Sequence, residues 1–172
     1  METSIVEEIH TTALERHPAS LYRIRFQDCD PFGHLNNGRY LDYIINAREE
    51  HLLQHYDLDL YSERFRDFNW VARSSRVNHL VPLRPNRMVR IQTGLLNFTR
   101  SQLLMEAVLT EPDSRTLHAT GWVEFIHVDT RTGRPARHAP ELMELFQLIS
   151  LNVEFSFAED RTRVNAIKKA LR

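Results

Sequence analysis

The sequence predicts one α+β domain in which a single long helix packs against an antiparallel sheet of about five strands. A short alternating pattern comes first, one long helical pattern follows it, and strand-like stretches fill residues 70–128. The connections between these stretches are short and rich in turn-forming residues, which favours an antiparallel meander over parallel crossovers. A chain of 172 residues suits one domain with a sizeable core.

The first element is a strand at residues 21–26. Apolar side chains alternate there with two arginines, as in a strand with one buried face. Continued alternation would place Asp28 and Asp30 on one side of the chain and Cys29 on the other, until turn-forming residues reverse the chain. Two acids are therefore expected where a strand ends.

The second element is an amphipathic helix that begins near Asn36 or Asn37 and runs to about His55. Asn36 is a suitable N-cap residue. The free N–H groups and positive dipole end of this helix would face the two acids and His34, a place for a substrate oxygen that gains negative charge. An acid beside such donors suggests acyl transfer. The apolar residues that we expect on the core-facing side are Leu41, Ile44, Ile45 and Leu52.

The remaining elements complete the sheet and close it. We expect strands at residues 70–81, 88–98, 102–110 and 117–128, and a closing helix from Pro140 to Ile149. Residues 1–19 are expected to form a loosely attached arm, residues 20–149 the folded domain and residues 150–172 a C-terminal extension. The extension alternates at first and then becomes helical. Its apolar stripe would cover either its own domain or a partner subunit, and we favour the partner.

The composition indicates a soluble cytoplasmic protein. Hydrophobic residues make up 42% and charged residues 26%, and no apolar run approaches membrane-spanning length. The first residues lack the basic and apolar regions of a signal peptide. A single cysteine excludes an intrachain disulfide and agrees with a reducing compartment. We interpret Cys29 as a small buried residue and not as a nucleophile, because the neighbouring acids would raise the pKa of its thiol.

The net charge of −1 is unevenly distributed. Residues 1–63 hold 5 basic and 12 acidic side chains, whereas residues 64–137 hold 12 basic and 6 acidic ones. Arginine binds phosphate groups well, although for any single arginine a solvated surface role is the simpler interpretation. The near-neutral total disfavours a nucleic-acid partner. The candidate phosphate contacts in the cationic middle are Arg73, Arg76, Arg84 and Arg87.

The histidines do not predict a metal site. His51 and His55 are four residues apart, but Leu52 occupies the position at which a zinc-binding helix signature carries its glutamate. The other histidines lack cysteine or carboxylate neighbours at ligand spacing, so we expect surface or hydrogen-bonded core histidines. His34 is the exception, because it lies within the acid-rich turn.

The stretch from Asp28 to Tyr40 resembles a known motif. It reads Asp-Cys-Asp-Pro-Phe-Gly-His-Leu-Asn-Asn-Gly-Arg-Tyr. This is similar to the pattern Asp-x-Asp-x-x-Gly-His-[Leu/Val]-Asn-Asn-x-x-Tyr of hotdog-fold acyl-thioester hydrolases of the 4-hydroxybenzoyl-CoA thioesterase-like type. Residues 77–85 and 128–135 also look like strand-edge signatures of this family, so the resemblance covers roughly residues 20–148.

The resemblance implies the hotdog fold, with a curved sheet wrapped around the central helix, and hydrolysis of an acyl-CoA thioester without a metal or other cofactor. Asp30 matches the family's nucleophile or general base, and both roles stay open. The backbone N–H of Asn37 matches the group that polarises the thioester carbonyl. His34 and Asn36 would order the turn, the water or the leaving sulfur, and Tyr40 is a further substrate-binding candidate. A purely structural role in capping the helix and bracing the turn is the alternative for Asp28, His34 and Asn36.

Two departures from related patterns shape the alternatives. Ile45 stands where many bacterial members carry a helix glutamate, and Phe32 stands where plant acyl-ACP thioesterases have an asparagine. The second departure favours a CoA substrate. The alternatives are a non-catalytic hotdog protein that binds an acyl ligand, an acyl-ACP thioesterase, or a hydratase of the same fold. Thiol release from acyl-CoA and acyl-ACP, with enoyl-CoA hydration alongside, would separate them.

The resemblance also implies an assembly. A single sheet of this kind leaves an edge strand uncovered, so we expect a homodimer joined edge to edge or a tetramer built from two such pairs. Active sites between subunits are what the resemblance implies.

Overall fold

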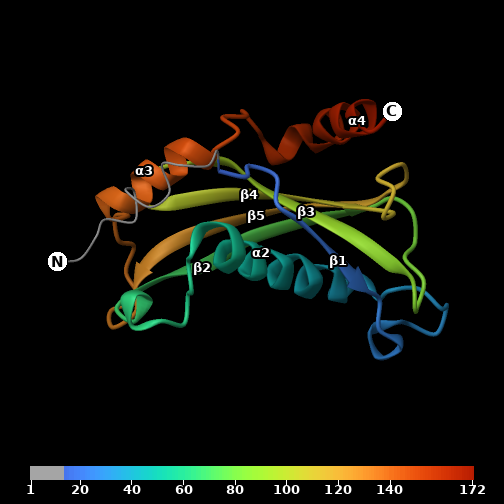
Figure 1. Cartoon of the computed structure of the whole chain (residues 1–172), viewed down its shortest axis with the longest axis horizontal. Coiled ribbons are helices and arrows are strands. Elements are labelled where there is room, and N and C mark those ends of the chain that lie inside the picture. Colours follow the sequence, from blue (N-terminus) through green and yellow to red (C-terminus); the bar gives the residue numbers. More distant parts are fainter. Residues whose placement is uncertain (1–13) are drawn as a thin grey trace.

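The structure is a computed structural model in which residues 14–172 are described, and it has the predicted α+β architecture (Figure 1). The strands are β1 (Ala19–Arg23), β2 (Phe68–His79), β3 (Met88–Phe98), β4 (Gln102–Thr110) and β5 (Leu117–Asp129). The helices are α2 (Tyr40–Tyr56), α3 (Pro140–Ile149) and α4 (Asp160–Ala170). All strand pairs are antiparallel, in the order β1-β3-β4-β5-β2. The sheet arches over α2, and α4 lies on the opposite side (Figure 1).

Strand β1 ends earlier than predicted. Beyond it Ile24 still pairs, because its N–H donates to the Arg87 carbonyl and its carbonyl accepts from the Asn86 N–H, both at 2.9 Å. The chain then forms the 3₁₀ helix η1 (Phe26–Asp28), closed by the Asp28 N–H bond to the Arg25 carbonyl at 3.1 Å. The predicted strand end at residue 26 was therefore wrong, and strand alternation does not carry on through the acids.

The meander is confirmed for β3, β4 and β5 and is wrong for β2. Strand β2 pairs with β5 and not with β3, which follows it in the chain, so β2 becomes an edge of the sheet. The connection at residues 80–87 looks like a hairpin in sequence. Its beginning is held by β5 instead, since the N–H groups of Leu80 and Val81 both donate to the His118 carbonyl at 2.9 and 3.1 Å.

Helix α2 presents a more polar face to the sheet than the sequence predicts. Ile44 is fully buried as expected, but Leu41, Ile45 and Leu52 are only partly buried. The buried positions of α2 include two polar residues. They are Tyr40, Ile44, Ala47, Arg48, His51 and Tyr56. The predicted apolar residues do contact the core, since Leu41, Ile45 and Leu52 pack against the buried cluster that includes Ile44. The prediction omitted the polar residues Arg48 and His51, which are more deeply buried.

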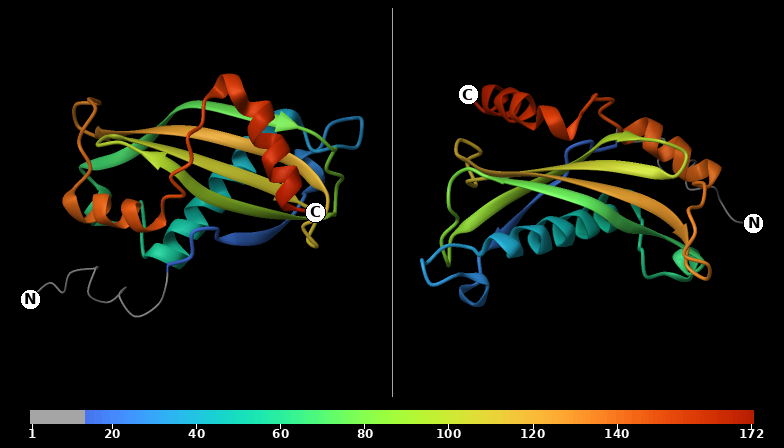
Figure 2. Two further views of the ribbon diagram at one scale, coloured as in Figure 1. Left: turned by 90° about the horizontal axis from the view of Figure 1, so that it is seen from above. Right: turned by 180° about the vertical axis from the view of Figure 1, so that it is seen from behind.

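The C-terminal extension packs on its own domain. Val164 and Ile167 of α4 join a buried cluster with Leu96, Val108 and Trp122 on the face of the sheet opposite α2. Seen from above, α4 runs across the strands (Figure 2). The preference for packing against a partner subunit was wrong for this apolar stripe, because the exposed side of the sheet supplies the apolar partner within the same chain.

A buried ion pair fastens α4 to the sheet. Arg163 donates to both carboxylate oxygens of Glu106, at 2.7 and 2.6 Å, and the Trp122 indole N–H donates to the same carboxylate at 2.9 Å. The Glu106 side chain is 6% exposed. At the other terminus, residues 1–13 of the predicted arm lie outside the described residues, and Arg16 binds the carbonyls of Leu148 and Ser150 at 3.0 and 2.7 Å. The described part of the arm is therefore anchored and not loose.

In the part of the chain from residue 14 onward, no helix combines the length and apolar character needed to cross a bilayer.

The ion pair gives a test of how the extension is held. Replacing Arg163 by methionine should lower the free energy of unfolding by about 3 kcal/mol, because Glu106 would stay buried without its counter-ion. Urea denaturation with a fluorescence readout measures this. The control is Arg161→Met, which removes an exposed arginine of the same helix. Equal unfolding midpoints for the two variants would contradict a contribution from the pair.

Candidate active site

The acid-rich loop is fixed at its centre by Leu35. This side chain is buried, and its N–H donates to the Leu83 carbonyl at 2.7 Å, which ties the loop to the β2–β3 connection. Cys29 and Leu35 form an isolated bridge across the loop. The loop residues between them project as a turn at the N-terminal end of α2. The sequence pattern thus becomes a short closed loop and not a strand end.

Asp30 holds this turn with part of its carboxylate. Its Oδ1 accepts from the N–H groups of Phe32 at 2.9 Å and His34 at 3.2 Å, and its own N–H donates to the His34 carbonyl at 2.8 Å. Within residues 14–172 the other carboxylate oxygen has no hydrogen-bond partner. One oxygen therefore fixes the orientation of the carboxylate while the second is left for a water or a substrate.

The start of the helix leaves one backbone donor without a partner. The N–H of Asn36 donates to the Asp28 carbonyl, that of Arg39 to the Asn36 carbonyl and that of Gly38 to the Asn36 side chain, at 2.9, 2.8 and 2.9 Å. Asn36 is therefore the predicted N-cap, of the 3₁₀ helix η2 (Asn37–Arg39) that leads into α2. Among the described residues, none accepts from the N–H of the exposed Asn37. The resemblance assigns this donor to a thioester oxygen, and that role stays a prediction.

His34 and Tyr40 lie in different environments, the first on the loop and the second in the core. The backbone of His34 bonds to Asp30, and its half-buried ring has no hydrogen-bond partner among residues 14–172. Tyr40 is 2% exposed, its ring packs edge-on against His79, and its hydroxyl oxygen accepts from the Leu83 N–H at 3.4 Å. Tyr40 is thus a core residue of the single chain, and its contact with substrate stays a prediction.

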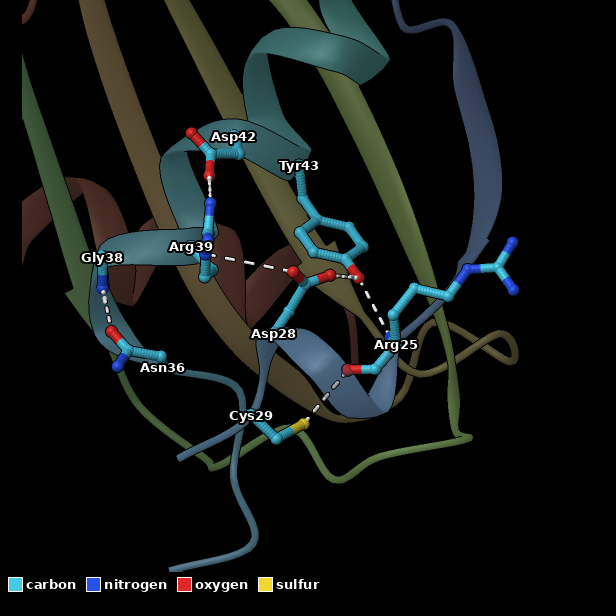
Figure 3. A network of polar contacts seen from close by, with 8 residues as sticks. All are labelled: Arg25, Asp28, Cys29, Asn36, Gly38, Arg39, Asp42 and Tyr43. Carbon is cyan, nitrogen blue, oxygen red and sulfur yellow. Dashed lines mark hydrogen bonds and ion pairs between the residues drawn. The ribbon is translucent and has the colours of Figure 1, made fainter. Parts of the chain in front are cut away.

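Asp28 braces the loop against α2 (Figure 3). The Tyr43 hydroxyl donates to Asp28 Oδ2 at 2.8 Å and accepts from the Arg25 N–H at 3.0 Å. Arg39 lies between two acids, 3.9 Å from Asp28 and 3.0 Å from Asp42. Burial raises the pKa of Tyr43, and the Asp28 carboxylate raises it further, so the hydroxyl stays protonated and donates. These contacts favour the structural alternative for Asp28.

Cys29 shows no sign of an activated thiol. Its Sγ donates to the Arg25 carbonyl at 3.4 Å (Figure 3). Desolvation raises the pKa of the thiol, and the charges of Asp28 and Asp30 raise it further. A thiol of this kind is neutral near pH 7 and is a poor nucleophile.

No sequence pattern assigned a role in this loop to Tyr43 or Arg25, and Arg39 lay within the motif without an assigned role. Their contacts join a strand exit, a turn and a helix, and the registers between these elements arise only in the fold. Tyr43 carries the one weak signal, because it lies one helical turn after Tyr40 and so near the same end of α2.

The arginines of the cationic middle differ in whether they are engaged within the fold or exposed to solvent, where they could contact a phosphate group. Arg76 is engaged by the extension, with its Nε 3.0 Å from Asp160 and a hydrogen bond to the Phe157 carbonyl. Arg84 and Arg87 are exposed and lie on the connection that holds the loop at Leu83. Arg73 is exposed on edge strand β2.

Residues 24–146 match the model of the thioesterase-like superfamily, and the chain belongs to this family. The family resemblance inferred from the motif is thereby confirmed. A relative of 26% identity over 122 residues is the L-carnitine dehydrogenase/betainyl-CoA thioesterase of Agrobacterium fabrum (strain C58). The match covers 71% of this chain but 25% of that protein, so the chain spans about a quarter of its relative.

Solved structures share the fold. The 1,4-dihydroxy-2-naphthoyl-CoA thioesterase Slr0204 from Synechocystis superposes with a TM-score of 0.69 at 12% identity, covering 80% of this chain and 99% of that one. The SAV2348 protein from Staphylococcus aureus, solved in complex with CoA, superposes with a TM-score of 0.71 at 12% identity, covering 86% and 93%. The probable thioesterase from Bartonella henselae gives 0.63 at 20% identity, covering 72% and 99%. The predicted hotdog fold is confirmed.

The brace between Asp28 and Tyr43 can be tested directly. In Tyr43→Phe, the Asp28 carboxylate and the Arg25 N–H both lose a partner, so the free energy of unfolding should fall by about 1 kcal/mol. Amide hydrogen exchange at Asn36, whose N–H bonds to Asp28, should become faster. Tyr61→Phe is the matched control, since it removes a hydroxyl that donates to Glu49 at an exposed site. Unchanged exchange at Asn36 would refute the brace.

Proposed function

We propose that this chain hydrolyses an acyl-CoA thioester to a free carboxylic acid and CoA, with Asp30 and the Asn37 N–H as its central groups. The observation that carries the proposal concerns two groups at the same end of α2. Within residues 14–172, the oriented carboxylate of Asp30 keeps one oxygen unbonded, and the backbone N–H of Asn37 has no partner. Membership of the thioesterase-like superfamily supports the reaction class.

As a general base, Asp30 takes a proton from water while the water oxygen bonds to the thioester carbonyl carbon. The Asn37 N–H holds the oxygen that becomes negative, at the positive end of the helix dipole. The carbon–sulfur bond then breaks, and the proton passes to the CoA thiolate. As a nucleophile, an Asp30 carboxylate oxygen would instead bond to the carbonyl carbon, the carbon–sulfur bond would break, and CoA thiolate would leave to be protonated. Water would then hydrolyse the resulting anhydride to the free acid and the Asp30 carboxylate. The geometry is compatible with both routes.

The neighbouring side chains have supporting roles in this proposal. His34, whose ring is without a partner in the described part of the chain, orders the attacking water or the leaving sulfur. Asn36 caps η2 through Oδ1, which keeps the Asn37 N–H directed outward and leaves its amide nitrogen for a substrate contact. Tyr40 supports the helix start from the core.

A CoA ester is favoured over other thioesters for two reasons. Arg84 and Arg87 are exposed on the connection bonded to the active-site loop, where they can reach the phosphates of CoA. The names of two similar proteins specify CoA thioesters, and a third was solved with CoA bound. The acyl groups named for those two proteins differ, betainyl in one and 1,4-dihydroxy-2-naphthoyl in the other.

Replacing Asp30 by asparagine tests the catalytic assignment. The asparagine keeps Oδ1 for the N–H groups of Phe32 and His34 but removes the charge, so kcat should fall about a hundredfold or more while the melting temperature hardly changes. Single-turnover cleavage of a panel of acyl-CoA thioesters measures this. The control is Asp42→Asn, which changes an exposed acid in the first turn of α2, outside the loop that holds Asp30.

Two outcomes would decide against the proposal. A folded Asp30→Asn protein that cleaves its best substrate near the native rate would show that Asp30 is structural. A native protein that is inert toward every acyl-CoA and acyl-ACP ester would favour the non-catalytic acyl-binding alternative.

The proposal includes a homodimer or a tetramer. Strand β2 bonds to β5 on one side, and within residues 14–172 no strand pairs with its other side, so 12 residues of backbone form an open edge. Val71 on this strand is 51% exposed, and Phe32 on the active-site loop is 82% exposed. An open edge and apolar side chains of this kind favour pairing with a second copy.

Light scattering tests the assembly. We expect a mass of about two or four times the 20.3 kDa of one chain at micromolar concentration. If the active sites lie between subunits, specific activity should fall on dilution below the concentration at which the subunits separate. A monomer that keeps full specific activity would contradict the assembly.

A further inference from the structure

Arg48 is a buried cation that has no anionic partner among residues 14–172. It lies on the sheet-facing side of α2 and is 8% exposed. Within residues 14–172, no carboxylate lies within ion-pair distance of its guanidinium, and no side chain or carbonyl accepts a hydrogen bond from it. Its contact is with an aromatic ring, since Cζ lies 4.0 Å from the centroid of Phe125.

This contact does not satisfy the guanidinium. The face of an aromatic ring stabilises a cation but accepts none of the five N–H bonds that arginine can donate. Burial lowers the pKa of Arg48 to about 10, so the side chain still carries its charge at neutral pH. A buried charge is costly unless an anion or hydrogen-bond acceptors compensate it.

The guanidinium borders a small cavity of about 50 Å³ under the C-terminal half of α2. This volume holds roughly three or four water-sized groups. The walls come from the sheet, from α2 and from α3, and they are mostly apolar. Besides Arg48, they include Leu103, Met105, Phe125, Phe146 and Ile149.

The polar neighbours in the cavity do not neutralise Arg48. Both ring nitrogens of His51 form hydrogen bonds, Nδ1 with Thr93 Oγ1 at 2.7 Å and Nε2 with Ser20 Oγ at 3.0 Å. Burial lowers the pKa of His51 to about 4, so its ring is uncharged at neutral pH. The residues that line the cavity all lie in the described part of the chain. Among them, Arg48 is therefore the residue that carries a formal charge at neutral pH.

The cavity is distinct from the candidate active site of the same chain. Arg48 lies eight residues beyond Tyr40, which is about 12 Å along a helix. Ile44 lies between Arg48 and Tyr40 on the helix and is fully buried against Gly121. A Cβ built on Gly121 would lie only 2.6 Å from Ile44 Cδ1. The Ile44 side chain fills the space there, and the residues that line the cavity include none from the loop that holds Asp30.

We infer that this cavity binds a small carboxylate, of the size of acetate or propionate, whose anionic end pairs with the Arg48 guanidinium. The planar guanidinium presents two parallel N–H donors that match the two oxygens of a carboxylate. The apolar walls suit the short alkyl end of the ligand. A fully hydrophilic anion would leave its remaining oxygens without donors in these surroundings. This inference does not depend on the proposed thioesterase activity.

The test compares propionate with propionamide, a neutral molecule of the same shape, by calorimetric titration of the full chain. Propionate should bind at least tenfold more tightly, and it should raise the melting temperature where propionamide does not. In Arg48→Met, which keeps most of the side-chain volume, the difference should disappear. The matched control is Arg64→Met, because Arg64 also lies over a phenylalanine ring, 5.3 Å from the centroid of Phe65, but is exposed to solvent.

Several results would overturn the inference. They are equal affinity for propionate and propionamide, no binding of either, or the same loss of propionate binding in the Arg64→Met control. Chloride that binds as tightly as propionate would show a general anion site and would refute the carboxylate class. If Arg48→Met fails to fold, the comparison of the probes on the native protein still decides.

Discussion

Helix α2 buries Ile44 against the sheet at Gly121, a position without a side chain. A Cβ there would lie 2.6 Å from Ile44 Cδ1, the end of a flexible side chain, so a larger residue would displace the Ile44 side chain from its place in the core. The same helix carries Tyr40 in the core at its N-terminal end, and Arg48 and His51 among its buried residues beyond Ile44. The candidate active site and the buried cavity thus both adjoin α2.

At the N-terminal end of α2, almost every polar group of the loop is used within the fold. Leu35 bonds to the β2–β3 connection, Asp28 to Tyr43, and Asn36 to the first turn of the helix. In such a loop the free-energy cost of reorganisation on ligand binding is small, because its donors and acceptors are already held in place. Among the described residues, the groups left over include one oxygen of Asp30 and the N–H of Asn37, which are the two that the proposed reaction uses. The hydrogen bonds that make the loop rigid also leave these two groups available.

The sequence was informative where the signal is local. Strands β3 and β4 and helix α3 have the predicted bounds, because alternation, turn residues and Pro140 define them within a few residues. The N-cap role of Asn36 was also local. Predictions failed where distant segments decide, as in the pairing of β2 with β5 and in the docking of α4 on its own sheet. Periodicity shows that a strand has a buried face but not which strand it lies beside.

For the candidate site too, the sequence predicted the local features but not the contacts between distant segments. The motif identified Asp30, His34, Asn36 and Asn37 as neighbours in one loop, and the structure brings them together at the start of α2. It could not reveal that the carboxylate of Asp28 faces Tyr43, since that contact joins residues from two elements. Nor could it reveal the buried Arg48, because an arginine in a helix is expected to lie in solvent.

Glu106 and Arg48 show how differently one fold can treat a buried charge. The carboxylate of Glu106 receives three hydrogen bonds, two from Arg163 and one from Trp122, so the fold itself explains why an acid can lie there. The guanidinium of Arg48 lies over the face of the Phe125 ring and has no hydrogen-bond acceptor among the described residues. Packing alone would favour an apolar side chain at that position, because replacing unsatisfied buried charges by apolar groups is commonly stabilising. A small carboxylate in the cavity, as inferred above, would supply the acceptors that residues 14–172 do not supply to Arg48.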